Sequence, residues 1–212
     1  MDGFQIDLIL HNNRELLIGA GVTLKITAVS FLLALIIGTV VGIGRYRPGL
    51  MRILFTPYVE IFRGTPLLIQ LFFIYYGLPS VGINLSNFTA AYLGIGLCGG
   101  AYISEIIRGS LYSVDKGQHE AAIALGLSWY QTMRFVIFPQ ALKVAIPPLM
   151  NSFSSQLKET SLVSVLAINE LTRAGQMVYS RTFRPCLLYT SPSPRDKIHH
   201  LVCRLLGVKG GG

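Results

Sequence analysis

Four long apolar blocks, separated by short polar segments, predict membrane-spanning helices. They cover residues 16–44, 53–78, 88–107 and about 141–168. Each reaches the roughly 20 residues that a helix needs to cross a hydrocarbon core about 30 Å thick. The second block is broken at Arg63-Gly64-Thr65-Pro66, and the fourth is interrupted by Pro147-Pro148 and a polar cluster. The pattern predicts an all-α integral membrane protein with about four spans.

Composition favours the same class of protein. Of the 212 residues, 51% are hydrophobic and 13% are charged, whereas a soluble domain usually has about a quarter of its residues charged. The cations behind the net charge of +8 cluster beside the apolar blocks, without the aromatic-basic interleaving of a nucleic-acid site. The acidic start lacks the basic segment of a cleaved signal peptide. The three cysteines lack the paired spacing of metal or redox sites, so we predict no metal and no cofactor.

The distribution of cations predicts the orientation in the membrane. Cytoplasmic connections carry an excess of Lys and Arg. Cations follow the first block and surround the third connection, whereas residues 79–87 carry no charge. This rule places the first and third connections in the cytoplasm and the N-terminus outside. Arginines after the fourth block lie on the predicted outer side, against the rule; they are Arg173, Arg181 and Arg184.

The third connection, residues 114–138, has the pattern of two short helices. Helix formers at 118–125 are followed by Gly126, a residue type that commonly stands just past a helix end. Ser128 and Gln131 have the spacing of a capping box. Glu120 supplies a charge, and Ile123 and Leu125 supply apolar side chains. The small side chains of Ala121 and Ala122 leave a surface against which a partner can pack closely. The segment suits insertion into a partner's groove, although an ordinary surface helix has the same local pattern.

Several sequence blocks together carry a family resemblance. They read EIFRGTPLLIQ at 60–70, AYISEIIRG at 101–109, KGQ at 116–118, EAA at 120–122 with Gly126 and Pro139, and LKETSLVS at 157–164. In this order they resemble the permease subunits of ATP-binding-cassette (ABC) importers for polar amino acids, the histidine, glutamine and arginine group. The resemblance extends from about residue 14 to residue 185.

The resemblance implies a permease-like helical bundle over residues 1–185, in a multi-pass protein of the bacterial cytoplasmic (inner) membrane. Such a subunit works with a second permease, identical or related, a cytoplasmic ABC ATPase dimer and an extracytoplasmic amino-acid-binding protein. It performs no covalent chemistry, since ATP hydrolysis belongs to the partner. The coupling loop, about 114–139, would contact the ATPase through Glu120, Ala121, Ala122, Gly126 and Pro139.

Polar residues at membrane depth are candidates for the substrate pathway because they are costly to bury there. At the first break, Arg63, Gly64, Thr65 and Pro66 free backbone groups that can coordinate an amino acid; a simple kink is the alternative. The second cluster comprises Asn151, Ser155, Gln156, Lys158, Glu159, Thr160 and Ser161. Lys158 and Glu159 offer a zwitterion one charge of each sign, or form part of an internal salt bridge.

Three further polar residues belong to the predicted pathway. Glu105 is expected to pair with Lys158 or Arg63. Gln70 and Tyr102 are weaker candidates, because either could make only helix–helix hydrogen bonds.

Residues 186–212 differ in character from the rest of the chain. The segment is turn-prone, and it contains no apolar run of span length. It resembles translated sequencing-adapter read-through joined to a truncated gene, in which case the family's fifth span is missing. A divergent extracellular tail is the alternative.

Other function classes fit the sequence less well. A self-sufficient secondary carrier or channel would explain the spans, but no inverted repeat is visible. An assembly factor that does not transport would leave the coupling-loop pattern unexplained. An enzyme is disfavoured because His11, His119, His199 and His200 form no catalytic spacing. The amino acid carried and the identity of the second permease are left open.

Overall fold

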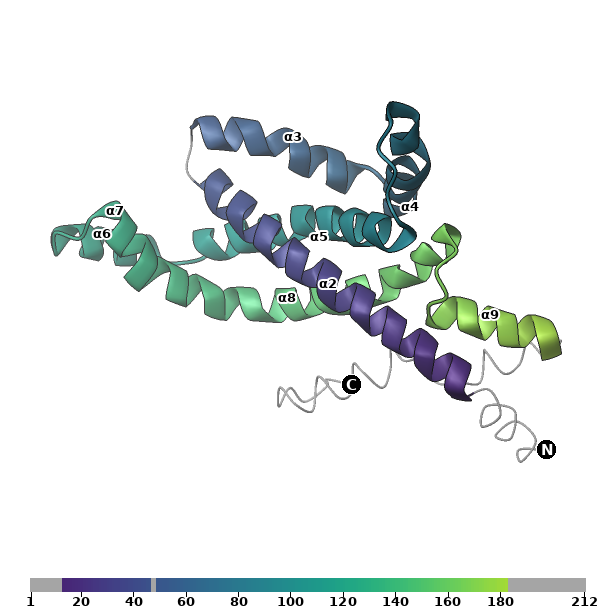
Figure 1. Ribbon diagram of the computed structural model, residues 1–212. Coiled ribbons are helices and arrows are strands. Elements are labelled where there is room, and N and C mark those ends of the chain that lie inside the picture. Colours follow the sequence, from purple (N-terminus) through teal and green to yellow (C-terminus); the bar gives the residue numbers. More distant parts are fainter. Residues whose placement is uncertain (1–12, 47–48, 183–212) are drawn as a thin grey trace. The chain divides into compact units, whose positions relative to one another are not determined.

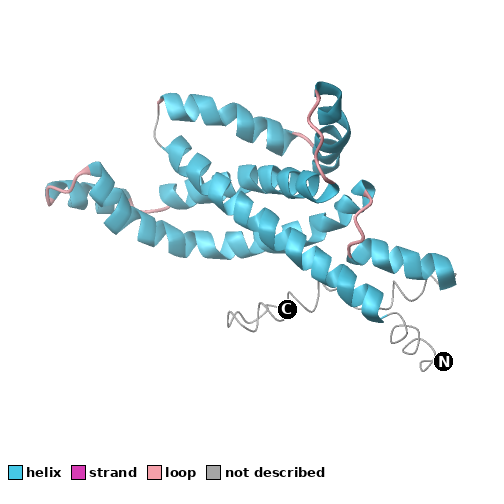
Figure 2. Cartoon of the chain, viewed as in Figure 1, coloured by secondary structure: helices cyan, strands magenta, loops and turns pink. Residues whose placement is uncertain are grey.

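The computed structural model describes residues 13–46 and 49–182, and within these ranges every regular element is helical (Figure 2). Arg47 and the predicted tail, 186–212, lie outside the described residues. The elements are α2 (Asn13–Tyr46), α3 (Leu50–Gly64), α4 (Leu67–Phe72), η1 (Phe73–Gly77), η2 (Leu78–Val81), α5 (Asn87–Tyr112), α6 (Lys116–Ala124), α7 (Trp129–Thr132), η3 (Met133–Ile137), α8 (Phe138–Glu159), η4 (Thr160–Leu166) and α9 (Leu171–Thr182). Segments η1 and η3 are π-helical, and η2 and η4 are 3₁₀-helical.

The chain divides into two compact units. One comprises Ile26–Gln156, and the other combines Met1–Lys25 with Leu157–Gly212. The long helices α2 and α8 each contribute residues to both units.

Among the described residues, two helices, α2 and α5, are long and apolar enough to cross a membrane. The pair Leu50–Gly64 and Leu67–Val81 qualifies when taken together, and it bends by 106° at the predicted break. The fourth predicted span is not among these, because polar residues crowd the last third of α8. Contrary to prediction, α8 runs through Pro147 and Pro148 without interruption, although each proline removes one N–H donor from the helical hydrogen bonds.

In the larger unit, α2 and α5 approach each other closely through glycines, whose small size lets helix backbones come together. A Cβ atom on Gly42 would lie 2.8 Å from the Ser104 carbonyl oxygen and 2.9 Å from the Ile107 Cβ. A Cβ on Gly96 of α5 would lie 3.0 Å from Leu33 Cγ. Neither helix can carry a larger side chain at these points without moving its neighbour.

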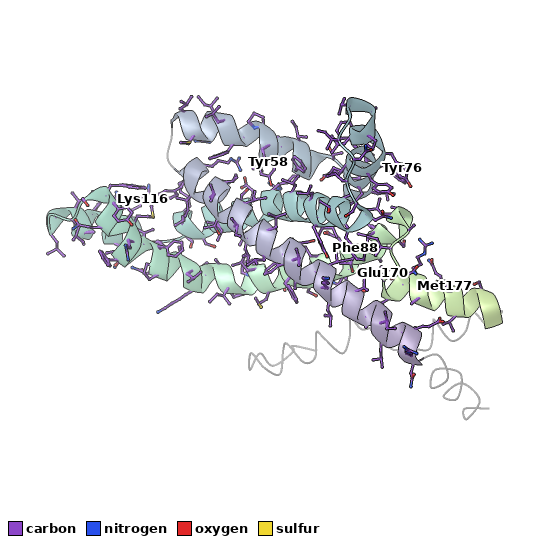
Figure 3. The ribbon with its side chains drawn as sticks, viewed as in Figure 1. Tyr58, Tyr76, Phe88, Lys116, Glu170 and Met177 are labelled. Carbon is purple, nitrogen blue, oxygen red and sulfur yellow. The ribbon has the colours of Figure 1, made fainter. Side chains whose placement is uncertain are left out.

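Helix α5 also has α3 and the region following α7 among its neighbours. Helix α3 runs alongside α5 (Figure 1), and the Tyr58 hydroxyl donates to the Leu97 carbonyl at 2.6 Å (Figure 3). Ile107 and Leu111 share a buried apolar cluster with Met133 and Ile137 of η3, which continues along α8. This cluster attaches the predicted coupling loop to the helices on either side of it.

In the smaller unit, the start of α9 is fixed by side chains that cap its free N–H groups. The Glu170 carboxylate accepts from the Thr172 N–H at 2.8 Å and the Arg173 N–H at 2.9 Å. Thr23 Oγ1 accepts from the Leu171 N–H at 3.1 Å, and the Arg173 side chain donates to the Ser164 carbonyl. These bonds connect α9 to the beginning of α2 and to η4.

Candidate functional site

The first helix of the coupling loop has a defined cap at each end. Asp115 Oδ1 accepts from the Gly117 N–H at 2.7 Å, so α6 begins at Lys116 instead of the predicted residue 118. At the other end Gly126 has a φ of +77°. Its N–H donates to the Ile123 carbonyl at 2.9 Å, and the Leu127 N–H donates to the Ala122 carbonyl at 3.1 Å. This is a Schellman motif, and it confirms the predicted end at Gly126.

The second helix begins as predicted but is not short. Ser128 and Gln131 form the complete capping box, in which the Ser128 N–H donates to Gln131 Oε1 at 2.8 Å. Helix α7 then continues through the π-helical η3 into α8. The prediction of two short helices is therefore wrong for the second one, because residues 129–138 contain neither glycine nor proline to end it.

Both π segments end two residues before a proline. Segment η1 ends at Gly77, before Pro79, and η3 ends at Ile137, before Pro139. The Phe138 N–H donates to the carbonyl of Met133, five residues earlier. A proline N–H is missing from the helical ladder, and in both places a wider turn adjoins the gap. The sequence signal was the proline, but its effect on the turn was not anticipated.

The predicted coupling residues differ in exposure. Glu120, Ala121, Gly126 and Pro139 are exposed, whereas Ala122 is buried. Ile123 and Leu125 present large apolar side chains that are 56% and 81% exposed. Gln140 at the start of α8 donates to Gln118 Oε1 at 3.2 Å. The exposed surface of α6 is thus mixed apolar and acidic, and α6 is connected to α8.

At the break between α3 and α4, the structure unites several predicted pathway residues. The guanidinium of Arg63 lies 5.4 Å from the centre of the Tyr102 ring, and Gly64 and Pro66 are exposed. Gln70 is buried, and its Nε2 donates to the carbonyls of Phe62 and Thr65, at 2.8 Å each. Gln70 therefore satisfies two of the backbone groups near the break.

Glu105 pairs with neither Lys158 nor Arg63, which corrects the sequence-based expectation. Its carboxylate is bonded to Arg45 at the end of α2 and to Arg108 one turn further along α5. The Arg108 Nη2–Oε2 distance is 2.6 Å. The Arg108 partner could have been recognised from its i+3 spacing. The Arg45 partner depends on the close contact between α2 and α5.

The second polar cluster is divided between the two units. Asn151 and Ser155 lie in the larger unit, one turn apart on α8, and both are exposed. In the smaller unit, the Thr160 hydroxyl donates to the Leu157 carbonyl at 2.7 Å and the Ser161 hydroxyl to the Lys158 carbonyl at 2.8 Å. Within the described residues, Lys158 and Glu159 form no ion pair. The Thr160 and Ser161 hydroxyls therefore satisfy backbone carbonyls at the C-terminal end of α8.

Gln156 belongs to the same predicted polar cluster. Its side chain is 2% exposed, and neither of its polar atoms has a hydrogen-bond partner in the described part of the chain. The sequence signal was its place in a polar cluster in the middle of the predicted span, about 141–168.

Comparison with known proteins decides the family. Residues 32–190 match the family described as "Binding-protein-dependent transport system inner membrane component". The chain belongs to this family. Membership agrees with a multi-pass protein of the inner membrane and with a subunit of a transport system. It favours this interpretation over a self-sufficient carrier or channel.

Relatives within this permease family include transporters with assigned substrates. The chain is 37% identical over 187 residues to the probable amino-acid ABC transporter permease protein YckA of Bacillus subtilis, covering 88% of the chain and 83% of YckA. It is 39% identical over 176 residues to the glutamine transport system permease protein GlnP of Escherichia coli, covering 82% and 80%. It is 37% identical over 169 residues to the arginine transport system permease protein ArtQ of B. subtilis, covering 78% and 76%.

Solved structures agree with the permease assignment. One described as an amino acid ABC transporter with histidines matches with a TM-score of 0.82 at 33% identity, covering 94% of the chain and 92% of its own. An inward-facing structure of the MetNI methionine ABC transporter matches with a TM-score of 0.70 at 21% identity, covering 98% and 94%. The second match shows the fold alone.

Proposed function

We propose that the chain is the membrane-spanning subunit of an ATP-driven importer that moves a polar amino acid across the bacterial cytoplasmic membrane. The family and the permeases GlnP and ArtQ support this class of substrate. The observation that carries the proposal is the coupling loop, where α6 is capped at both ends and presents Ile123 and Leu125 to solvent. In this proposal the N-terminus is outside, and the loop faces the cytoplasm.

In the proposed complex, each partner would carry out a different step of transport. A cytoplasmic ABC ATPase dimer would hydrolyse ATP, a binding protein would deliver the amino acid, and a second permease, identical or related, would complete the pore. Ile123 and Leu125 would enter a groove of the ATPase, with Glu120 at the rim. Because α6 bonds to α8 and packs near η3, movement of the ATPase would displace these helices as bodies between outward- and inward-open states.

Substitution of Gly126 tests the coupling role. Gly126→Asp forces a side chain onto a left-handed residue, which deforms the end of α6. We expect loss of the co-purifying ATPase and of transport-coupled ATP hydrolysis. Gly82→Asp is the matched control, because Gly82 also has a positive φ, of +86°, and open space around it, but lies in the predicted external connection. A complex that stays intact in Gly126→Asp would count against the docking role.

For the substrate pathway, we retain Arg63–Pro66, Tyr102, Asn151, Ser155 and residues 158–161. Gln70 and Glu105 act, in this proposal, as positioning residues, since each is engaged with other groups of the protein. Lys158→Met and Glu159→Gln should abolish or alter uptake while the protein stays in the membrane at its normal level. Uptake by the assembled transporter and membrane immunoblots measure the two quantities. Full retention of transport and specificity in both variants would reject the assignment.

A further inference from the structure

The side-chain amide of Gln156 is buried without a hydrogen-bond partner. Of the buried amides in the described ranges, it is the one for which both the oxygen and the nitrogen lack a partner. A carboxamide offers two N–H donors and one oxygen acceptor. Buried polar groups in native proteins are almost always bonded, so an unbonded one requires an explanation.

The amide of Gln156 lies against the bare backbone of α5. A Cβ added to Gly99 would collide with Gln156 Nε2, and it would come within 2.9 Å of Gln156 Cδ and 3.1 Å of the Ala34 Cβ. Gly99 belongs to the small-residue stripe of α5, together with Gly96 and Gly100. Such a stripe alone explains only close helix packing. The amide directed into the stripe is what packing leaves unexplained.

A purely structural role does not account for this amide. Gln70, the other buried glutamine of the described chain, donates to two backbone carbonyls and thereby stabilises the helix break. Gln156 makes no such bond. One turn earlier on α8, Phe153 packs edge-on against Phe31 of α2, with ring centres 5.0 Å apart. An apolar side chain of similar size would fill the position beside these rings without burying polar atoms.

We propose that Gln156 is a substrate-contacting residue that recognises a neutral polar group of the transported amino acid. This inference rests on the proposed import function. Binding sites are mostly apolar and contain a few polar groups that fix the orientation of the ligand. Gly99 and Ala34 carry no charge, and an isolated ion would be costly to bury beside a neutral amide. A carboxamide of the substrate can donate to Gln156 Oε1 and accept from its Nε2 once the side chain moves off Gly99.

The experiment measures binding of L-glutamine, L-methionine and L-arginine to the permease–ATPase complex in nanodiscs. The binding protein is omitted so that its own selectivity does not enter. L-Methionine is close in size to L-glutamine but lacks the amide. In Gln156→Leu we expect the preference for glutamine over methionine to fall about tenfold, the worth of one or two neutral hydrogen bonds. In Gln156→Glu, the preference for arginine over glutamine should rise by a similar factor.

A change of selectivity separates recognition from packing, since a packing defect weakens all three ligands together. Gly109→Ala is a neutral control on α5, the helix that Gln156 lies against, because a Cβ at Gly109 meets nothing within 4 Å. Unchanged ligand ratios in both Gln156 variants would overturn the inference while leaving the import function standing. A wild-type complex that neither binds nor transports any amino acid would overturn both.

Discussion

The contact between α2 and α5 gives a quantitative prediction for Gly42→Ala. The new methyl group would lie 2.8 Å from the Ser104 carbonyl oxygen, 2.9 Å from the Ile107 Cβ and 3.0 Å from its Cγ2. Comfortable carbon contacts are about 3.5–4.0 Å. The nearest obstacle is backbone, which cannot rotate away as a flexible side chain could. The two helices must therefore separate over the contact.

The magnitude follows from two opposing effects. Overpacking of this kind costs about 1–3 kcal/mol, whereas replacing glycine by alanine inside a helix returns up to about 1 kcal/mol. Gly21→Ala on the same helix is the control, because a Cβ there meets nothing within 4 Å. Gly21→Ala gains the higher helix propensity of alanine without a steric clash. Gly42→Ala should therefore be less stable than Gly21→Ala by about 1–3 kcal/mol.

Thermal unfolding in detergent, followed by fluorescence or by the fraction remaining monodisperse, measures the difference. For a chain of this size, each kcal/mol shifts the midpoint by about 2–4 °C, so the two variants should differ by roughly 2–12 °C. Gly42→Val should widen the gap, because it adds two more methyl groups to the same contact. If Gly42→Ala were as stable as Gly21→Ala, the close approach of α2 and α5 would be refuted.

Two other predictions concern interactions made by single side chains. Glu105→Gln removes the charge between Arg45, which is buried, and Arg108; charge-assisted bonds contribute about 1.5–3 kcal/mol each, so the unfolding midpoint should fall by several degrees. Arg108→Gln should lower the unfolding midpoint less than Glu105→Gln does, because the Arg108 side chain is more exposed. Equal decreases in the midpoint for the two variants would contradict the burial of Arg45. Ser128→Ala removes an N-cap and should destabilise the start of α7 by about 1 kcal/mol. Hydrogen exchange faster at residues 129–132 than in wild type would support the cap, and unchanged exchange there would exclude it.

The sequence predicted the features that depend on neighbouring residues. Gly126 and the pair Ser128–Gln131 define the coupling loop through local backbone geometry, and the structure confirms both. The break after Gly64 was predictable for the same reason, because a proline restricts the residue before it.

Features that depend on distant residues were not predictable in this way. The bond between Glu105 and Arg45 joins positions 60 residues apart, and it requires the crossing of α2 and α5 to be known. The uninterrupted passage from α7 into α8 includes the π turn η3, and Pro139 alone did not indicate that this turn would form. The sequence placed Gln156 in the second polar cluster, but nothing in the sequence shows which buried amides find a partner.

The π segment η3 affects how movement of the ATPase would be transmitted through this chain. A π turn accommodates about one residue more than an α-helical turn, and one residue corresponds to about 100° of rotation about a helix axis. A change of Met133–Ile137 from a π turn to an α turn, with no residue lost, would therefore rotate the coupling loop about the axis of α8 by roughly that angle. Every individual helix would keep its sequence. The direction in which Ile123 and Leu125 point thus depends on the type of helical turn at residues 133–137.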